Sequence, residues 1–193
     1  DLALVGGKAL NLGLMKESGF PVPDGFCVTT DAYQKIAKSI KADKNIVIPV
    51  EIQKKIQTAY DKIGKGKVAV RSSATSEDLP NASFAGQQDT FLNVQGFSEL
   101  VEAVKNCWLS LWTERAVAYR RDRDIDEKEL AMAVVVQNMI ESEVSGVMFS
   151  VNPTDSQEQV VIESSWGLGE AVVSGEVSPD RFVVDKSSLQ IIE

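Results

Sequence analysis

The sequence predicts an α+β fold of two lobes, in which a helix-rich part gives way to a strand-rich part near Gln137. Apolar residues recur at helical spacing in several segments before that point. Short apolar runs typical of strands follow it, and no internal repeat or low-complexity linker interrupts the chain. We therefore expect residues 1–136 to form an N-terminal lobe and residues 137–193 a second, strand-rich lobe.

The first predicted element is a helix that opens at Gly6-Gly7-Lys8 and ends near Gly19, where a left-handed residue is favoured. After two prolines, the stretch GFCVTT predicts a short strand. Thr30 is well placed to cap the helix that follows this strand. The N-terminal part thus begins with a glycine-led helix, a strand and a second helix.

An amphipathic helix is expected from Glu51, and its apolar stripe comprises Ile52, Ile56, Tyr60 and Ile63. The segments KVAVRSS and TFLNV predict two strands with a polar loop between them. From Ser98 a long helix keeps one face apolar and ends in the charged run 120–129, which is typical of a solvated helix end. The strands expected beyond it are LAMAVVVQNMI, SGVMFSV, QVVIESS and RFVVDK, with one short helix at GLGEAVVSG.

Composition argues against several classes of protein. The chain has 193 residues, 44% of them hydrophobic, which is enough for a full core. A net charge of −8 with scattered basic residues argues against binding to nucleic acid or to an anionic membrane. No apolar run is long enough to span a membrane, and no secretory segment precedes Cys27 and Cys107. We therefore expect a cytoplasmic protein with two reduced thiols in its core.

The chain contains no histidine. Histidine acid–base catalysis, phosphohistidine formation and most zinc sites are therefore excluded within it.

The polar loop between the strands KVAVRSS and TFLNV has the composition of a phosphate-binding segment. Arg71 stands where the alternating strand ends, and its guanidinium presents a planar fork of donors that matches phosphate oxygens. An ion pair with Glu77 or Asp78 explains Arg71 equally well from spacing alone. The segment 81–88 alternates small and hydrogen-bonding residues, which lets backbone N–H groups approach a ligand, although an Ω-loop can share this composition.

Lys8 follows two glycines at the start of the predicted helix, so its charge adds to the positive end of the helix dipole. The segment GGKAL is not a Walker A loop, because it lacks the four-residue spacer and the Ser or Thr after the lysine. GLGEAV is not a dinucleotide fingerprint, because Val172 stands where a small residue belongs and no βαβ unit surrounds it.

Six stretches, in this order, closely resemble the N-terminal ATP-binding domain of the phosphoenolpyruvate synthase (pyruvate, water dikinase) family. They are LVGGKALNLGLM, VPDGFCVTTDAY, VAVRSSATSEDLPNASFAGQQDTFLNVQG, VVVQNMI, SGVMFSVNP and SSWGLGEAVVSGEVSPDRFVV. Similar domains occur in pyruvate, phosphate dikinase and rifampicin phosphotransferase, and FLNVQGF with WGLGE favours the synthase. The resemblance implies an ATP-grasp-like fold with two lobes around a nucleotide cleft, of which the C-terminal lobe is incomplete.

The resemblance also implies roles for individual residues. Lys8 and Arg71 would handle the phosphates of ATP as the catalytic residues. The other residues expected near the phosphates are Ser83, Gly86, Gln87 and Thr90. The residues expected against adenine form a strand between the lobes, namely Gln137, Asn138, Met139 and Ile140.

Magnesium is the second cofactor that the resemblance implies, with ligands that lie mostly beyond Glu193. Within the chain, Glu163 and Glu170 are the carboxylates in strand-rich positions that could face a cleft, and neither is assigned as a ligand. The expected partner domains, one that carries a phosphohistidine and one that binds pyruvate, also lie beyond the chain. The chain is therefore interpreted as a fragment, with a connection near residues 42–48 that is either shortened or lacks residues.

The expected function is the ATP-binding portion of a phosphoenolpyruvate synthase. Such an enzyme uses ATP to phosphorylate a histidine on another domain and then pyruvate, giving phosphoenolpyruvate, AMP and phosphate. Two alternative functions also involve nucleotide binding. One is the ATP-binding domain of an antibiotic kinase like rifampicin phosphotransferase, and the other is a nucleotide-binding module without catalytic activity. In each case we expect the chain alone to be inactive.

Overall fold

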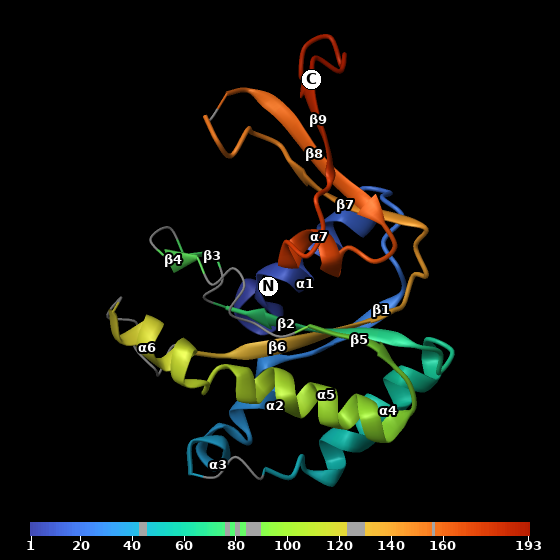
Figure 1. Ribbon diagram of the computed structural model, residues 1–193. Coiled ribbons are helices and arrows are strands. Elements are labelled where there is room, and N and C mark those ends of the chain that lie inside the picture. Colours follow the sequence, from blue (N-terminus) through green and yellow to red (C-terminus); the bar gives the residue numbers. More distant parts are fainter. Residues whose placement is uncertain (43–45, 76–77, 80–81, 84–89, 123–129, 156) are drawn as a thin grey trace. The chain divides into compact units, whose positions relative to one another are not determined.

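The computed structural model describes residues 1–42, 46–75, 78–79, 82–83, 90–122, 130–155 and 157–193 (Figure 1). The chain forms two compact units, Asp1–Met139 and Ile140–Glu193. Both units combine helices with antiparallel strands, which confirms the predicted α+β class.

The first unit is built on a four-stranded antiparallel sheet. Its strands lie in the order β1 (Gly25–Val28), β6 (Met132–Asn138), β2 (Val68–Ala74) and β5 (Thr90–Val94). The pairing of β2 with β6 runs without interruption from Val68 opposite Asn138 to Ala74 opposite Met132. β6 is buried almost throughout, as a run of β-branched residues in a central strand should be. The sequence LAMAVVVQNMI therefore contributes a central strand to the first unit.

The hydrophobic core of this unit lies on one face of the sheet. The helices α4 (Val50–Lys62) and α5 (Phe97–Ser110) pack there, while α1 (Leu2–Glu17) lies on the other side (Figure 1). The core residues drawn from α4 and α5 include Ile52, Ile56, Leu100, Val104 and Trp108. Val68 and Val70 of β2 meet them and are fully buried. The stripe predicted for α4 is confirmed for Ile52, Ile56 and Tyr60.

The predicted cap at Thr30 is wrong. The helix α2 (Thr30–Gln34) has Thr29 at its N-cap position, and Thr30 is its first helical residue. Thr30 is buried, and its hydroxyl donates to the carbonyl oxygen of Ala3 at 2.9 Å. A buried hydroxyl needs a partner, and here it finds one in α1 instead of in its own helix.

The long helix predicted from Ser98 is also wrong in its extent. α5 ends at Ser110, and a separate helix, α6, covers Glu114–Asp122. The predicted solvated end is wrong for Arg120, which is 2% exposed and lies 5.3 Å over the ring of Trp112. A guanidinium over an aromatic face combines packing with an electrostatic attraction, which favours burial of this arginine.

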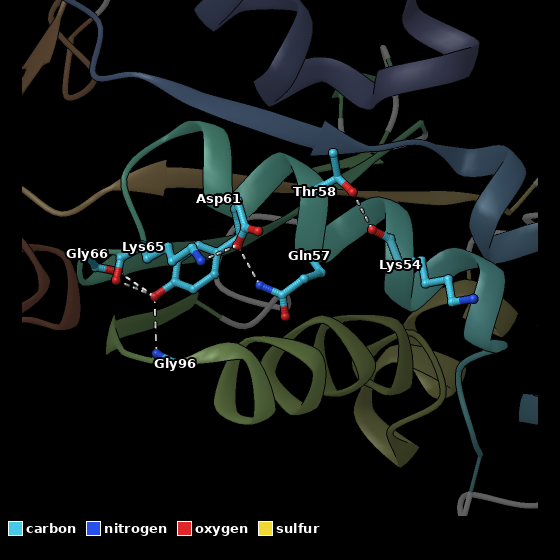
Figure 2. Close-up of polar contacts among 8 residues, drawn as sticks. Lys54, Gln57, Thr58, Asp61, Lys65, Gly66 and Gly96 are labelled. Carbon is cyan, nitrogen blue, oxygen red and sulfur yellow. Dashed lines mark hydrogen bonds and ion pairs between the residues drawn. The ribbon is translucent and has the colours of Figure 1, made fainter.

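The hydroxyl of Tyr60 joins two turns at one end of the core. It lies 2.7 Å from the carbonyl oxygen of Gly66 and 3.0 Å from that of Lys65, and it accepts a hydrogen bond from the N–H of Gly96 at 3.1 Å. Figure 2 shows these turns together with Asp61, which contacts Gln57 and Lys65. The chain leaving α4 is thus fixed to the chain entering α5.

We expect Tyr60→Phe to lower the free energy of unfolding by about 1–2 kcal/mol, because it removes the hydroxyl that lies within hydrogen-bond distance of three backbone groups next to a buried ring. Urea denaturation measures this change. Thr58→Ala is the control, since its hydroxyl donates to the carbonyl oxygen of Lys54 on the exposed side of the same helix (Figure 2). A loss for Tyr60→Phe no larger than that of this control would contradict the role of the hydroxyl.

The second unit contains a three-stranded antiparallel sheet of β7 (Val144–Phe149), β8 (Gln159–Trp166) and β9 (Asp180–Asp185). A short helix, α7 (Glu170–Ser174), follows β8. These elements confirm the strands and the helix predicted for this region. After β9 the chain returns, and the N–H of Ile192 donates to the carbonyl oxygen of Val183 at 2.8 Å.

The remaining elements are a helix, α3 (Ala37–Ala42), and a two-stranded hairpin of β3 (Asp78–Leu79) and β4 (Ala82–Ser83). Within the described residues, no helix has the length and apolar character needed to cross a membrane.

Candidate functional site

Gly6 introduces a sharp kink into α1. Its backbone angles are φ 73° and ψ 173°, so two helical segments meet there. A Cβ atom at this position would lie 2.2 Å from the carbonyl oxygen of Ser73, and the left-handed φ also disfavours a side chain. The predicted helix start at Gly6-Gly7-Lys8 is therefore wrong for the whole helix, which begins at Leu2, but a helical segment restarts at these residues.

Ser73 fills the gap that the kink opens in the helix. Its hydroxyl donates to the carbonyl oxygen of Val5 at 2.8 Å and accepts from the N–H of Ala9 at 3.2 Å. In a regular α-helix, the N–H of Ala9 would bond the carbonyl of Val5 directly, because these residues are four apart. One side chain from β2 thus replaces an interrupted helical hydrogen bond, directly beside Lys8.

Arg71, Thr90 and Gln137 lie on the sheet face that α1 covers. Arg71 stands opposite Thr90 of β5 and Val135 of β6 in the strand register, and cross-strand partners share a face. Val70 faces the core on the other side, so Arg71 and Ser73, which alternate with it, face α1. Gln137, two residues after Val135, is on the same face.

The strand register therefore brings Arg71 and Thr90, both predicted near the phosphates, and Gln137, predicted against adenine, to a single surface. Arg71 is half-buried, Thr90 is exposed and Gln137 is 8% exposed. Lys8 is half-buried on the helix that covers this surface. Whether their side chains meet one ligand stays a prediction.

The rest of the stretch predicted against adenine lies at the end of β6 and just beyond it. The N–H of Asn138 donates to the carbonyl oxygen of Asp24 at 2.8 Å, and the N–H of Met139 donates to that of Lys67 at 2.9 Å. Ile140 is 58% exposed and is the first residue of the second unit. Two backbone donors of this stretch are thus already used inside the first unit.

The remaining predicted loop residues lie in a separate hairpin or outside the described residues. Ser83 belongs to the hairpin strand β4, where it pairs with Asp78. Gly86 and Gln87 lie outside the described residues, and so does Glu77, the alternative ion-pair partner of Arg71. Their proposed contacts stay predictions.

A small cavity of about 180 Å³ lies between α1 and the strands β1 and β6. Gln137 lines it together with Ala9, Leu12, Gly13, Lys16, Cys27 and Val135. Sites for small molecules usually measure about 300–1,000 Å³, so this cavity fits only part of a nucleotide. Larger cavities of about 380 and 490 Å³ adjoin β1 and α4, but no described residue of the predicted site lines them. We place the candidate site at the α1 face, where those residues gather.

Cys27 also lies at this face, and its thiol is 4.0 Å from the carbonyl oxygen of Val5. Burial raises the pKa of Cys27 to about 11, so it carries a neutral thiol at pH 7. Cys107 is buried in the core on the opposite face of the sheet, as predicted, whereas Cys27 is half-buried outside that core. Neither cysteine forms a disulfide, as predicted.

The two carboxylates considered for magnesium lie in the second unit. Glu163 of β8 stands opposite Val147 and Arg181, and Glu170 is the exposed first residue of α7. In the part of the chain that the structure describes, no three or more carboxylate, thiol or imidazole side chains are grouped as metal ligands. Neither glutamate is therefore assigned to a metal.

Ser73 is the residue that the sequence did not single out. Its position two residues after Arg71 places it on the same strand face, which was the one available signal. Its contact with Val5 joins residues 68 apart in the sequence. A contact of that range leaves no local pattern from which it could be predicted.

Comparison with known proteins identifies the family. The family described as "Pyruvate phosphate dikinase, AMP/ATP-binding domain" matches residues 2–48 and 40–193. The two matches overlap at residues 40–48, the region in which the sequence predicts a connection that is shortened or lacks residues.

Relatives along the whole chain are named as phosphoenolpyruvate synthases. The chain is 48% identical to "Phosphoenolpyruvate synthase" of Aeropyrum pernix over 229 residues, covering 100% of the chain and 28% of that protein. It is 42% identical over 228 residues to "Probable phosphoenolpyruvate synthase" of Methanothermobacter thermautotrophicus, with 33% of that protein covered. The corresponding protein of Archaeoglobus fulgidus is 44% identical over 227 residues, with 30% covered.

The chain spans about a third or less of the length of these relatives. The match nevertheless extends over all of it, which confirms the resemblance that the six motifs indicated. The chain belongs to the AMP/ATP-binding domain family of pyruvate phosphate dikinase.

Proposed function

We propose that this chain is the ATP-binding portion of a phosphoenolpyruvate synthase and that Lys8 and Arg71 bind the phosphates of ATP. The observation that carries this proposal is the double hydrogen bond of Ser73, which ties the kink beside Lys8 to the strand of Arg71. Two cationic residues that are far apart in the sequence thereby belong to one rigid piece of structure. The family description and the names of the relatives support the nucleotide and the enzyme.

The residues present fit a polyphosphate ligand by their chemistry. Lys8 supplies a point charge near the start of the helical segment that follows Gly6, where the helix dipole also favours an anion. Arg71 supplies a planar fork that can bind two phosphate oxygens at once. Thr90, opposite Arg71 on β5, adds a hydroxyl donor. Ser83, Gly86 and Gln87 would complete the phosphate contacts.

For the adenine ring we propose the stretch Gln137–Ile140. Because the N–H groups of Asn138 and Met139 donate inside the protein, their carbonyl groups are the better candidates for the exocyclic amine of adenine. The thioether of Met139 would pack against the ring, as methionines commonly do with aromatic groups.

In the complete enzyme, ATP would supply a phosphoryl group to a histidine on another domain and then to pyruvate, with magnesium held mostly by residues outside this chain. Phosphoryl transfer depends mainly on positioning and on stabilisation of charge, so Lys8 and Arg71 would act as fixed cations. We propose an ATP-grasp-like fold for this domain, with residues 1–136 and 137–193 as its lobes.

Nucleotide titration of the chain tests the phosphate assignment. We expect ATP to bind about tenfold more tightly than adenosine, because two charge-assisted contacts are available only to the phosphates. Amide NMR spectra of the chain measure both affinities and report which residues respond. Lys8→Ala should reduce this preference, whereas Lys105→Ala should keep it, since Lys105 pairs with Glu102 on a helix across the sheet. Equal affinities for ATP and adenosine in the unaltered chain would overturn the proposal.

A further inference from the structure

The hydroxyl of Ser73 lies between two backbone groups of α1 that would bond each other in a regular helix. The φ of 73° at Gly6 turns the carbonyl of Val5 away from the N–H of Ala9, and the Ser73 hydroxyl bonds both groups. Ser73 is fully buried, and so is the kink at Gly6 and Gly7. The hydroxyl is therefore the group that satisfies these two backbone atoms in a place with little access to water.

The backbone of α1 at Gly6 packs closely against the backbone of β2 at Ser73. The carbonyl oxygen of Ser73 lies only 2.2 Å from where a Cβ of Gly6 would stand. Glycine at position 6 thus lets the helix approach β2 closely enough for the hydroxyl of Ser73 to reach both groups. The contact fixes the distance and the rotation of this part of α1 relative to the strand.

Lys8 stands immediately before Ala9, and Arg71 stands two residues before Ser73 on the same strand face. The hydrogen bonds of Ser73 therefore connect the backbone that carries one predicted phosphate ligand with the backbone that carries the other. A change at Ser73 releases α1 at the kink without removing either charge.

We propose that Ser73 is a positioning residue for the phosphate-binding pair. It holds the kink of α1 so that Lys8 and Arg71 are set to bind the same polyphosphate group. This inference rests on the proposed function, because it assigns the phosphates of ATP to those two residues.

The test compares Ser73→Ala with Ser72→Ala in the full chain. Both changes remove one buried hydroxyl from β2, but Ser72 faces the opposite side of the sheet from α1. Two quantities are measured by NMR: the exchange rate of the Ala9 amide with solvent, and the ratio of the affinities for ATP and adenosine. The ratio reports on phosphate binding and is insensitive to a general loss of stability.

We expect Ser73→Ala to speed Ala9 exchange and to lower the ATP-to-adenosine affinity ratio by about threefold, the loss of roughly one of the two charge-assisted contacts that together give the tenfold preference. Adenosine affinity should not change, and Ser72→Ala should keep the ratio. If Ser73→Ala does not fold, Ser73→Cys carries the same comparison, because a thiol keeps the size of the side chain but hydrogen-bonds weakly.

Two results would overturn the inference alone. In one, Ala9 exchange is unchanged, which means that the hydroxyl does not hold the kink. In the other, Ala9 exchange speeds up while the affinity ratio stays at the value of the unaltered chain, which makes Ser73 a structural residue only. If the unaltered chain shows no preference for ATP, the proposed function fails as well, and the two failures are thereby distinguished.

Discussion

Arg71→Ala, made in a phosphoenolpyruvate synthase that carries this domain, should lower kcat by about two to three orders of magnitude. Arg71 is a half-buried residue on a central strand opposite Val135, so we expect water to screen its charge less than that of an exposed arginine. A donor pair fixed in this way stabilises phosphate oxygens whose charge changes during transfer. Steady-state turnover with ATP and pyruvate measures the effect.

Two further variants distinguish the bidentate geometry of the Arg71 guanidinium from its positive charge alone. Arg71→Lys should recover little of the lost turnover, because an ammonium group cannot bind two oxygens in the geometry of a guanidinium. Arg121→Ala, at the exposed end of α6, should leave turnover close to that of the unaltered enzyme. Near-normal turnover of Arg71→Ala, together with a loss of stability in urea, would instead support an ion pair of Arg71 with an acidic residue of the loop.

The elements that the sequence predicted well are those with a strong local pattern. TFLNV became β5 with the same ends, because it contains Thr, Phe and Val, which favour strands, and a polar loop and a glycine flank it. The stripe of α4 was correct for the same reason, since three apolar residues at helical spacing determine which side of the helix is buried.

The errors arose where a side chain found a partner that its residue type did not indicate. Thr30 has the chemistry of a cap, but its hydroxyl bonds Ala3, which is 27 residues away. Arg120 belongs to a charged run, but the ring of Trp112 lies beneath its guanidinium. For Thr30 the tertiary structure supplied a partner that no window of neighbouring residues contains. Trp112 precedes Arg120 by eight residues, and its contact was missed because the charged run was interpreted as solvated.

In the candidate site, too, some features could be predicted from local sequence and others could not. Lys8 and Arg71 could be proposed from their residue types, from the glycines and hydroxyls around them and from the resemblance to a family. Their link through Ser73 could not be predicted, because it depends on a kink at Gly6 and on a strand more than sixty residues later. The shared face of Arg71 and Gln137 depends on strand register, which the sequence of one strand does not determine.

The largest effect is expected for the chain on its own. Incubated with ATP, magnesium and pyruvate, the 193-residue chain should form no phosphoenolpyruvate, whereas a full-length synthase carrying the same domain should form it readily. The chain has no histidine that could accept a phosphoryl group. Its described residues contain no acidic cluster that could hold magnesium between phosphates. It also spans only 28–33% of the first relatives that it matches.

Nucleotide binding should be weak for the same reason. A domain that supplies Lys8 and Arg71, but not the magnesium ligands, neutralises only part of the charge of ATP, so we expect a dissociation constant in the high micromolar to millimolar range. Radiolabelled ATP followed by chromatography measures product, and calorimetry with and without magnesium measures affinity. Magnesium-dependent binding in the low micromolar range would mean that the chain itself provides the metal ligands. Product formation would mean that a residue other than histidine can carry the phosphoryl group, and either result would contradict the division of labour proposed for this domain.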